Sequence, residues 1–165
     1  MIDEIVDSVL SHMKEKLGDE MEIQDQYPLE IIRVTKPLLY TECVGFDRSD
    51  VQPASGLFSI DANFETRICF PVSRRALERK KARRMATKVA LMIEGNSFGQ
   101  NRCYPARLKS AYDDGLDPDA PTVETWSITW EMQIFLGDQS LQEDLFLKAS
   151  EKEFDTKDEV TRDRS

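Results

Sequence analysis

The chain has 165 residues and is 40% hydrophobic, which suffices for one domain with a core and a spare tail. Its formal net charge of −9 argues against binding of DNA or RNA by bulk electrostatics. No apolar run approaches the roughly 18 to 20 residues of a membrane span. Cys43, Cys69 and Cys103 are far apart and form no C-x-x-C pair, so we expect reduced thiols rather than a zinc site or disulfide framework.

An amphipathic helix is predicted over residues 3–17, where apolar side chains recur at helical spacing and Gly18 provides the stop. The apolar stripe consists of Ile2, Ile5, Val6, Val9, Met13 and Leu17. His12, the one histidine of the sequence, lies beside this stripe. A catalytic base would need a partner that the sequence does not show, so we expect His12 to be a surface or partly packed residue.

Two strands are predicted next, over residues 29–34 and 38–46, with a turn at Lys36-Pro37 between them. Residues 47–56 are then predicted to form a polar loop, which is long for a hairpin. Long loops in compact domains are often functional or mobile. The loop therefore supplies three candidate contact residues for a partner protein, Asp47, Arg48 and Asp50.

The strongest periodic signal runs from Leu57 to Ile93. Over residues 58–70 the even positions are apolar or small and most odd positions are polar, which predicts one half-buried strand that Pro71 ends. Ser73 can cap the following helix, and Gly95-Asn96 ends it. The predicted buried stripe of this helix contains Ala82, Met85, Ala86, Val89, Ala90 and Ile93.

Basic residues crowd the start of this second helix. Those predicted to lie broadly opposite the buried stripe are Arg79, Lys80, Arg83 and Arg84. Like charges four residues apart repel, so this density opposes helix stability unless something neutralises it. Three interpretations stay open: a solvated face neutralised by Glu78, Glu94 or the acidic tail, contact with an acidic protein surface, or contact with nucleic acid. In an acidic chain the cluster also suggests head-to-tail complementarity between identical subunits, as a ring requires.

Two further strands are predicted over residues 103–112 and 122–136, with an acidic loop at 113–119 between them. Asp113, Asp114 and Asp117 of this loop are candidate interaction residues. Their spacing lacks the order of a calcium-binding hand, so we expect a solvated hairpin loop. Trp126 and Trp130 share the apolar face of the last strand, where a sheet-core role is favoured over a ligand-stacking platform.

The order of these elements predicts an α+β two-layer sandwich: a mainly antiparallel sheet of about five strands with two main helices packed on it. We expect residues 1–137 to form a single domain and the acidic residues 138–165 to form a flexible tail with a short helix at 139–149. No motif for phosphate cradling, nucleophilic catalysis or zinc binding is present. We therefore expect no cofactor, no metal and no enzymatic activity.

A resemblance to a known family covers most of residues 3–137. It is carried by two stretches, LFSIDANFETRICFPVSRRALERKKARRMATKVALMIEG and VETWSITWEMQIFLG. The arrangement is similar to that of the tail terminator (tail-completion) proteins of long-tailed bacteriophages. The resemblance implies a structural virion protein that forms a hexameric ring, caps the tail tube at its final length and offers a surface to the head–tail connector. It also implies assembly in the host cytoplasm, a place at the head-proximal end of the tail, no membrane contact, and DNA only as passing cargo.

Two other classes of function stay open beside this one. The first is another phage neck or minor tail component, such as a head-closure protein. The second is a small α+β enzyme or ligand-binding protein that uses the tryptophan face or the acidic loop. No individual functional residue is carried over from the tail terminators, because that family has no catalytic motif to match.

Overall fold

The computed structural model describes residues 1–25, 35–52, 57–73, 75–116 and 122–137. In chain order the elements of these ranges are α1 (Ile2–Leu17), β1 (Glu22–Ile23), β2 (Leu38–Arg48), β3 (Phe58–Pro71), α2 (Ala76–Ile93), β4 (Arg107–Leu116) and β5 (Val123–Leu136). The strands form one sheet in the order β1-β2-β3-β5-β4, in which the β1–β2 pair is parallel and the other pairs are antiparallel. The predicted α+β class is confirmed.

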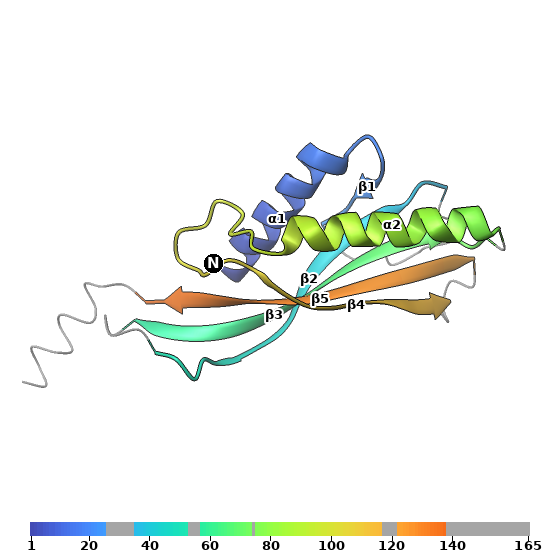
Figure 1. Cartoon of the computed structure of the whole chain (residues 1–165). Coiled ribbons are helices and arrows are strands. Elements are labelled where there is room, and N and C mark those ends of the chain that lie inside the picture. Colours follow the sequence, from blue (N-terminus) through green and yellow to red (C-terminus); the bar gives the residue numbers. More distant parts are fainter. Residues whose placement is uncertain (26–34, 53–56, 74, 117–121, 138–165) are drawn as a thin grey trace, which may run out of the picture.

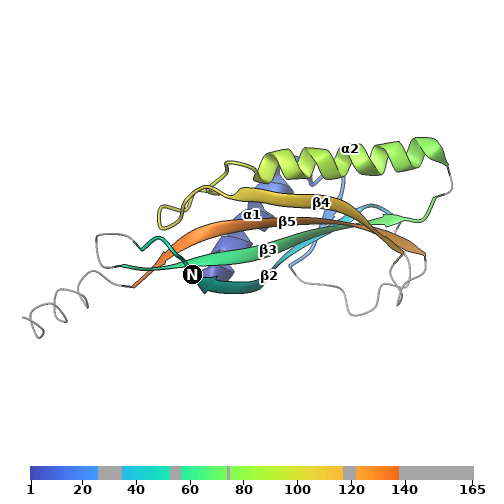
Figure 2. The same cartoon turned by 60° about the horizontal axis from the view of Figure 1, so that its bottom comes forward.

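Both helices lie on one face of the sheet (Figure 1). No helix of the described residues covers the opposite face, which we call the open face, although one part of it is buried in a small cluster of Leu38, Tyr40, Cys69 and Val123. α1 packs against β1 and β2, whereas α2 runs along β4 and β5. Figure 2 brings the open face forward, with the strands in front of α1. An antiparallel sheet that is covered on one side alternates apolar and polar side chains, and this explains the regular pattern of β3 and β5.

The core lies between the helices and the even-numbered residues of β3 and β5. Trp130 is fully buried there and stacks on Phe64 with ring centroids 4.3 Å apart. Its indole Nε1–H donates to Thr66 Oγ1 at 3.0 Å, and Thr66 shares a 2.9 Å hydrogen bond with Thr41. The polar atoms under the helices are therefore paired with one another, as burial requires. The sheet-core role predicted for the tryptophan face is confirmed, although Trp126 is only half-buried.

Several predicted boundaries were wrong, and most lie at strand ends. β2 continues to Arg48, so Asp47 and Arg48 are strand residues rather than loop residues. β4 starts at Arg107 and continues to Leu116, so the predicted acidic loop begins inside a strand. Register shifts between Leu108 and Ser110 and between Asp113 and Gly115 let β4 keep pairing with β5 through this polar stretch. Bulges of this kind have no clear signature in side-chain periodicity.

The helix predictions were closer. α2 begins at Ala76, and Ser73 Oγ accepts a hydrogen bond from Arg75 N at 3.2 Å without capping the first helical turn itself. The predicted end is confirmed, because Gly95 follows the helix with φ 73°. The two-residue strand β1 was not predicted. The predicted strand at 29–34 and the predicted tail 138–165, with its short helix, lie outside the described residues.

Candidate interaction surface

The basic residues of α2 fall into two groups according to what surrounds them. Arg79, Lys80 and Arg83 line a groove of about 470 Å³ beside β4 and β5, and Arg84 lies outside it. All of these side chains are exposed, on a helix whose buried residues are Ala82, Ala86, Val89, Ala90 and Ile93. The prediction that all four lie opposite the buried stripe is therefore too simple, because the groove residues flank that stripe.

Ion pairing neutralises only part of this cluster. Lys81 pairs with Glu78 at 3.0 Å, and Lys88 pairs with Glu20 of the α1–β1 connection. Among the described residues, Arg79, Lys80, Arg83 and Arg84 have no ion-pair partner. Their mutual repulsion along the helix is therefore not relieved by ion pairs within the described ranges.

The groove also brings acidic and aromatic side chains to the basic group. Asp113 of β4 and Glu124 and Trp126 of β5 complete its lining. Asp113 Oδ1 accepts a hydrogen bond from Gly115 N at 2.9 Å, which supports the bulge where Gly115 has φ 81°. The structure thus joins two regions that are far apart in the sequence, the basic start of α2 and the acidic end of β4.

The remaining acidic candidates at this end of the sheet do not share the groove. Asp114 is next to Asp113 but accepts from Ser127 Oγ at 3.4 Å. Asp117 lies outside the described residues. Within the described ranges no cluster of three or more His, Cys, Asp or Glu side chains could hold a metal ion.

Asp47, Arg48 and Asp50 lie at the opposite end of the sheet. Arg48 is aligned with Ile60 and through it with Ile134, whereas Asp113 is aligned with Trp126. At about 3.3 Å per strand residue, the two groups are roughly 26 Å apart along the sheet. The candidate residues therefore belong to two separate surfaces, one at each end.

The turn after β2 is held to the sheet by amide side chains. Gln133 Nε2 donates to Ser49 Oγ at 2.8 Å and to Val51 O at 2.9 Å. Gln52 exchanges hydrogen bonds with the backbone of Ser59, and Ser59 Oγ donates to Val51 O at 2.8 Å. The first part of the predicted polar loop is thus a hydrogen-bonded turn, and residues 53–56 lie outside the described ranges.

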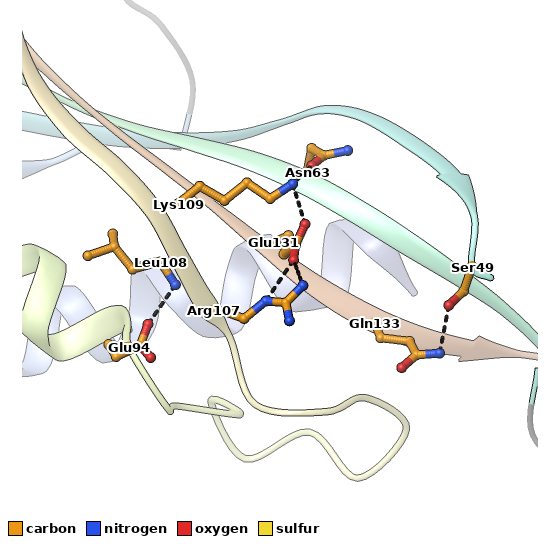
Figure 3. Close-up of polar contacts among 8 residues, drawn as sticks. All are labelled: Ser49, Asn63, Glu94, Arg107, Leu108, Lys109, Glu131 and Gln133. Carbon is orange, nitrogen blue, oxygen red and sulfur yellow. Dashed lines mark hydrogen bonds and ion pairs between the residues drawn. The ribbon is translucent and has the colours of Figure 1, made fainter. Parts of the chain in front are cut away.

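A charged network on the open face was missed by sequence reasoning (Figure 3). Glu131 of β5 forms ion pairs with Arg107 and Lys109 of β4, and Lys109 Nζ also donates to Asn63 Oδ1 at 3.5 Å. Glu94, just after α2, accepts from Leu108 N at 2.6 Å and ties the helix end to the same strand. The one available signal was the polar odd-numbered positions of β5, which do not reveal the register with β4.

The pKa of Glu131 reflects this environment. Burial alone would raise the pKa of the carboxyl group, but the hydrogen bonds and charges of Lys109 and Arg107 outweigh burial and leave it below the ordinary 4.5. The network therefore stabilises the folded state above about pH 4.5, and this contribution is lost as the pH falls through the lowered pKa.

We predict that Glu131→Gln lowers the free energy of unfolding at neutral pH and that its difference from the wild type shrinks below pH 4.5. Urea unfolding at a series of pH values measures this difference. Asp25→Asn is the matched control, because Asp25 is exposed and has no ion pair among the described residues. A difference that persists undiminished to the lowest pH would contradict the role given to the Glu131 carboxylate.

Like charges also face one another on the open face. Asp47 is directly opposite Asp61, and Glu42 is directly opposite Glu65. Glu65 is neutralised by Arg67 at 2.8 Å, whereas Asp47, Asp61 and Glu42 have no ion pair among the described residues. Like charges directly opposite in an antiparallel pair are destabilising, so these two pairs oppose the stability of the β2–β3 pairing.

The described surface shows no arranged catalytic centre around the one histidine. His12 is half-buried, lies 3.3 Å from Asn96 Nδ2 and meets the ring of Phe98 edge-on. This confirms the predicted partly packed residue. Neither α1 nor α2 combines the length and the apolar character that a membrane span requires.

Comparison with known proteins finds a shared fold among solved structures. No protein-family model and no curated protein sequence matches the chain. Among solved structures, the fold matches a chain of the "Virion of native gene transfer agent (GTA) particle" with a TM-score of 0.55 and 9% sequence identity. The match covers 82% of this chain and 95% of that one. At this identity the likeness shows a shared fold, and the shared fold extends over nearly the whole of the virion chain.

Proposed function

We propose that the chain is a structural subunit of a phage-like virion, and that it forms the ring that ends tail-tube polymerisation and receives the head. The observation that carries this proposal is the fold shared with nearly the full length of a gene transfer agent virion chain. The resemblance of β3, α2 and β5 to tail terminators supports the more specific part of the proposal, a position at the end of the tail tube. The role is one of binding, with no catalytic step.

A ring of identical subunits needs two different patches that fit each other and a rotation that closes. The chain offers cations without ion-pair partners on α2, on one side of the sheet, and opposed carboxylates on the other side. It also offers backbone groups at the sheet edges, along the outer strand β4 and along the part of β2 that follows its two-residue pairing with β1. These features support head-to-tail contacts within a hexamer.

The other contacts follow from the same proposal. The tail tube protein binds one rim of the ring, and the head–tail connector binds the opposite rim. The two ends of the sheet, marked by Asp47, Arg48 and Asp50 and by Asp113, are the surfaces that we assign to these partners. The ring is assembled in the host cytoplasm, occupies the head-proximal end of the tail, and passes DNA through its channel as cargo.

Electron microscopy of particles produced without this protein tests the proposal. Removing the subunit that stops polymerisation leaves the tube without an end signal, so we expect abnormally long tails that carry no head. Supplying the protein on a plasmid restores both length and attachment. Tails of normal length joined to heads in its absence would contradict the role.

A further inference from the structure

Two hollows adjoin beneath the first turns of α2, where the helix lies over the end of β4 and the start of β5 (Figure 1). One is the basic groove of about 470 Å³, and the other has a volume of about 430 Å³. Arg79, Ala82 and Glu124 line both hollows, so the two form one continuous site, which we call the α2 slot. The apolar residues that line the second hollow are Pro37, Phe70, Pro71, Val72, Ala82 and Met85.

The slot is open because α2 carries small side chains near its start. The first two buried residues of the helix are Ala82 and Ala86, whereas the larger Val89 and Ile93 follow near its end. A methyl group does not reach as far toward the sheet as a valine or isoleucine side chain, so space remains beside Ala82. Trp126 of β5 stays half-buried there and lines the basic groove. Each hollow has the size of a typical ligand site.

The basic part of the slot offers cations without an ion-pair partner. Arg79, Lys80 and Arg83 are exposed, and none of them forms an ion pair with a described residue. Asp113, which lines the same groove, already accepts a hydrogen bond from Gly115 N. Contacts between guanidinium and carboxylate groups are charge-assisted and often bidentate, and arginine clusters are a recurrent means of binding acidic motifs. The basic part therefore fits a ligand that carries several carboxylates.

Two carboxylates in the groove favour a peptide over a nucleic acid as this ligand. A nucleic-acid backbone carries a negative charge on every nucleotide and would bring phosphates close to Asp113 and Glu124. A peptide can instead place its carboxylates on the cations and an uncharged residue beside Glu124. We propose that the α2 slot binds an acidic peptide segment of another protein, with carboxylates on Arg79, Lys80 and Arg83 and an apolar side chain in the second hollow. This inference does not depend on the proposed function in the virion.

Fluorescence anisotropy of a fluorescein-labelled peptide, made of glutamate and aspartate around one central leucine, tests the proposal on the full-length chain. Arg83→Glu is expected to weaken binding about tenfold or more, because it puts a carboxylate in the groove. Arg84→Glu is the matched control, since it makes the same charge change at the adjacent exposed residue, which does not line the groove. In 0.15 M salt, which screens exposed charges beyond about 8 Å, its effect stays below about twofold. No binding to the wild type, or equal weakening by both variants, would overturn the proposal.

Val72→Ser tests the apolar part of the slot. Val72 lines only the second hollow, and 40% of its surface is exposed. This variant is expected to weaken binding of the leucine peptide severalfold and to leave unchanged the binding of a peptide with serine in place of the leucine. Leu91→Ser changes an exposed apolar residue of α2 that lines neither hollow, and it alters neither affinity. Equal weakening of both peptides by Val72→Ser would contradict the place given to the apolar side chain.

Labelled oligothymidylate in the same assay separates a peptide site from a nucleic-acid site. We expect it to bind the wild type more weakly than the leucine peptide does. Tighter binding of the oligonucleotide, lost in Arg83→Glu and retained in Arg84→Glu, would assign the slot to nucleic acid and overturn the proposal.

Discussion

Replacing Trp130 with alanine is expected to lower the free energy of unfolding by about 3–5 kcal/mol, a large part of the stability of a domain this size. Trp130 has no exposed surface, and its ring stacks on Phe64 and lies 5.9 Å from the ring of Phe98. The substitution leaves a cavity and removes the hydrogen bond from the indole to Thr66. Chemical denaturation followed by circular dichroism measures the loss.

Trp126→Ala is the matched control, since it removes the same side chain from the same strand face. Trp126 is half-buried and lines the groove beside α2, so water can occupy part of the space that it leaves. We expect a clearly smaller loss of stability than for Trp130. Equal losses for the two variants would contradict the assignment of Trp130 to the centre of the core.

Reversing charge at the outer part of α2, with Lys80→Glu and Arg84→Glu together, is expected to abolish the ring and leave the subunit folded. Both side chains are exposed and have no ion pair among the described residues, so the isolated subunit loses little. If these two side chains face an acidic surface of the neighbouring subunit, changing them to glutamate turns the attraction between the subunits into repulsion. A loss of 1.4 kcal/mol per contact already weakens each contact about tenfold. Light scattering reports the mass of the assembly.

Lys14→Glu and Lys16→Glu on α1 provide the control for this reversal. They change the net charge of the subunit by the same amount, at exposed positions of the other helix. The ring is expected to survive them. If both double variants dissociate to the same extent, the effect comes from net charge, and the specific role given to α2 is wrong.

The sequence was most informative where one face of an element is buried along its whole length. β3 and β5 alternate over their full lengths because one layer of helices covers their even-numbered residues, so a period of two is unambiguous. The buried stripe of α2 was predictable because one side of the helix packs on the sheet, so its apolar residues recur with a period of 3.6. All three elements therefore appear in the structure within two or three residues of the predicted bounds.

The edge strand β4 shows where this reasoning stops. Nearly all of its residues are exposed, so its polar residues can occupy either face, and two bulges shift the alternation further. Asp113 was therefore assigned to a loop although it lies in a strand facing the groove. Likewise, the pairing of Glu131 with Arg107 and Lys109 depends on the β4–β5 register, which no local pattern determines.

The candidate residues were identified by type but could not be grouped from the sequence alone. Arg79, Lys80 and Arg83 share a groove with Asp113 because α2 runs along β4 and β5, and this groove joins segments some thirty residues apart in the chain. Arg84 was grouped with them because all four residues were predicted to lie broadly opposite the buried stripe, yet it does not line the groove. Asp47, Arg48 and Asp50 are at the other end of the sheet, as the strand register shows.

Electron microscopy of purified tail tube protein polymerising with and without this chain tests the central claim most directly. If the chain forms a ring that caps the tube, its addition will shorten the tubes, stop their growth and place a ring at one end of each. K80E/R84E will lose this effect while K14E/K16E retains it. Tubes that grow to the same lengths with bare ends in the presence of the folded wild-type protein would contradict the account.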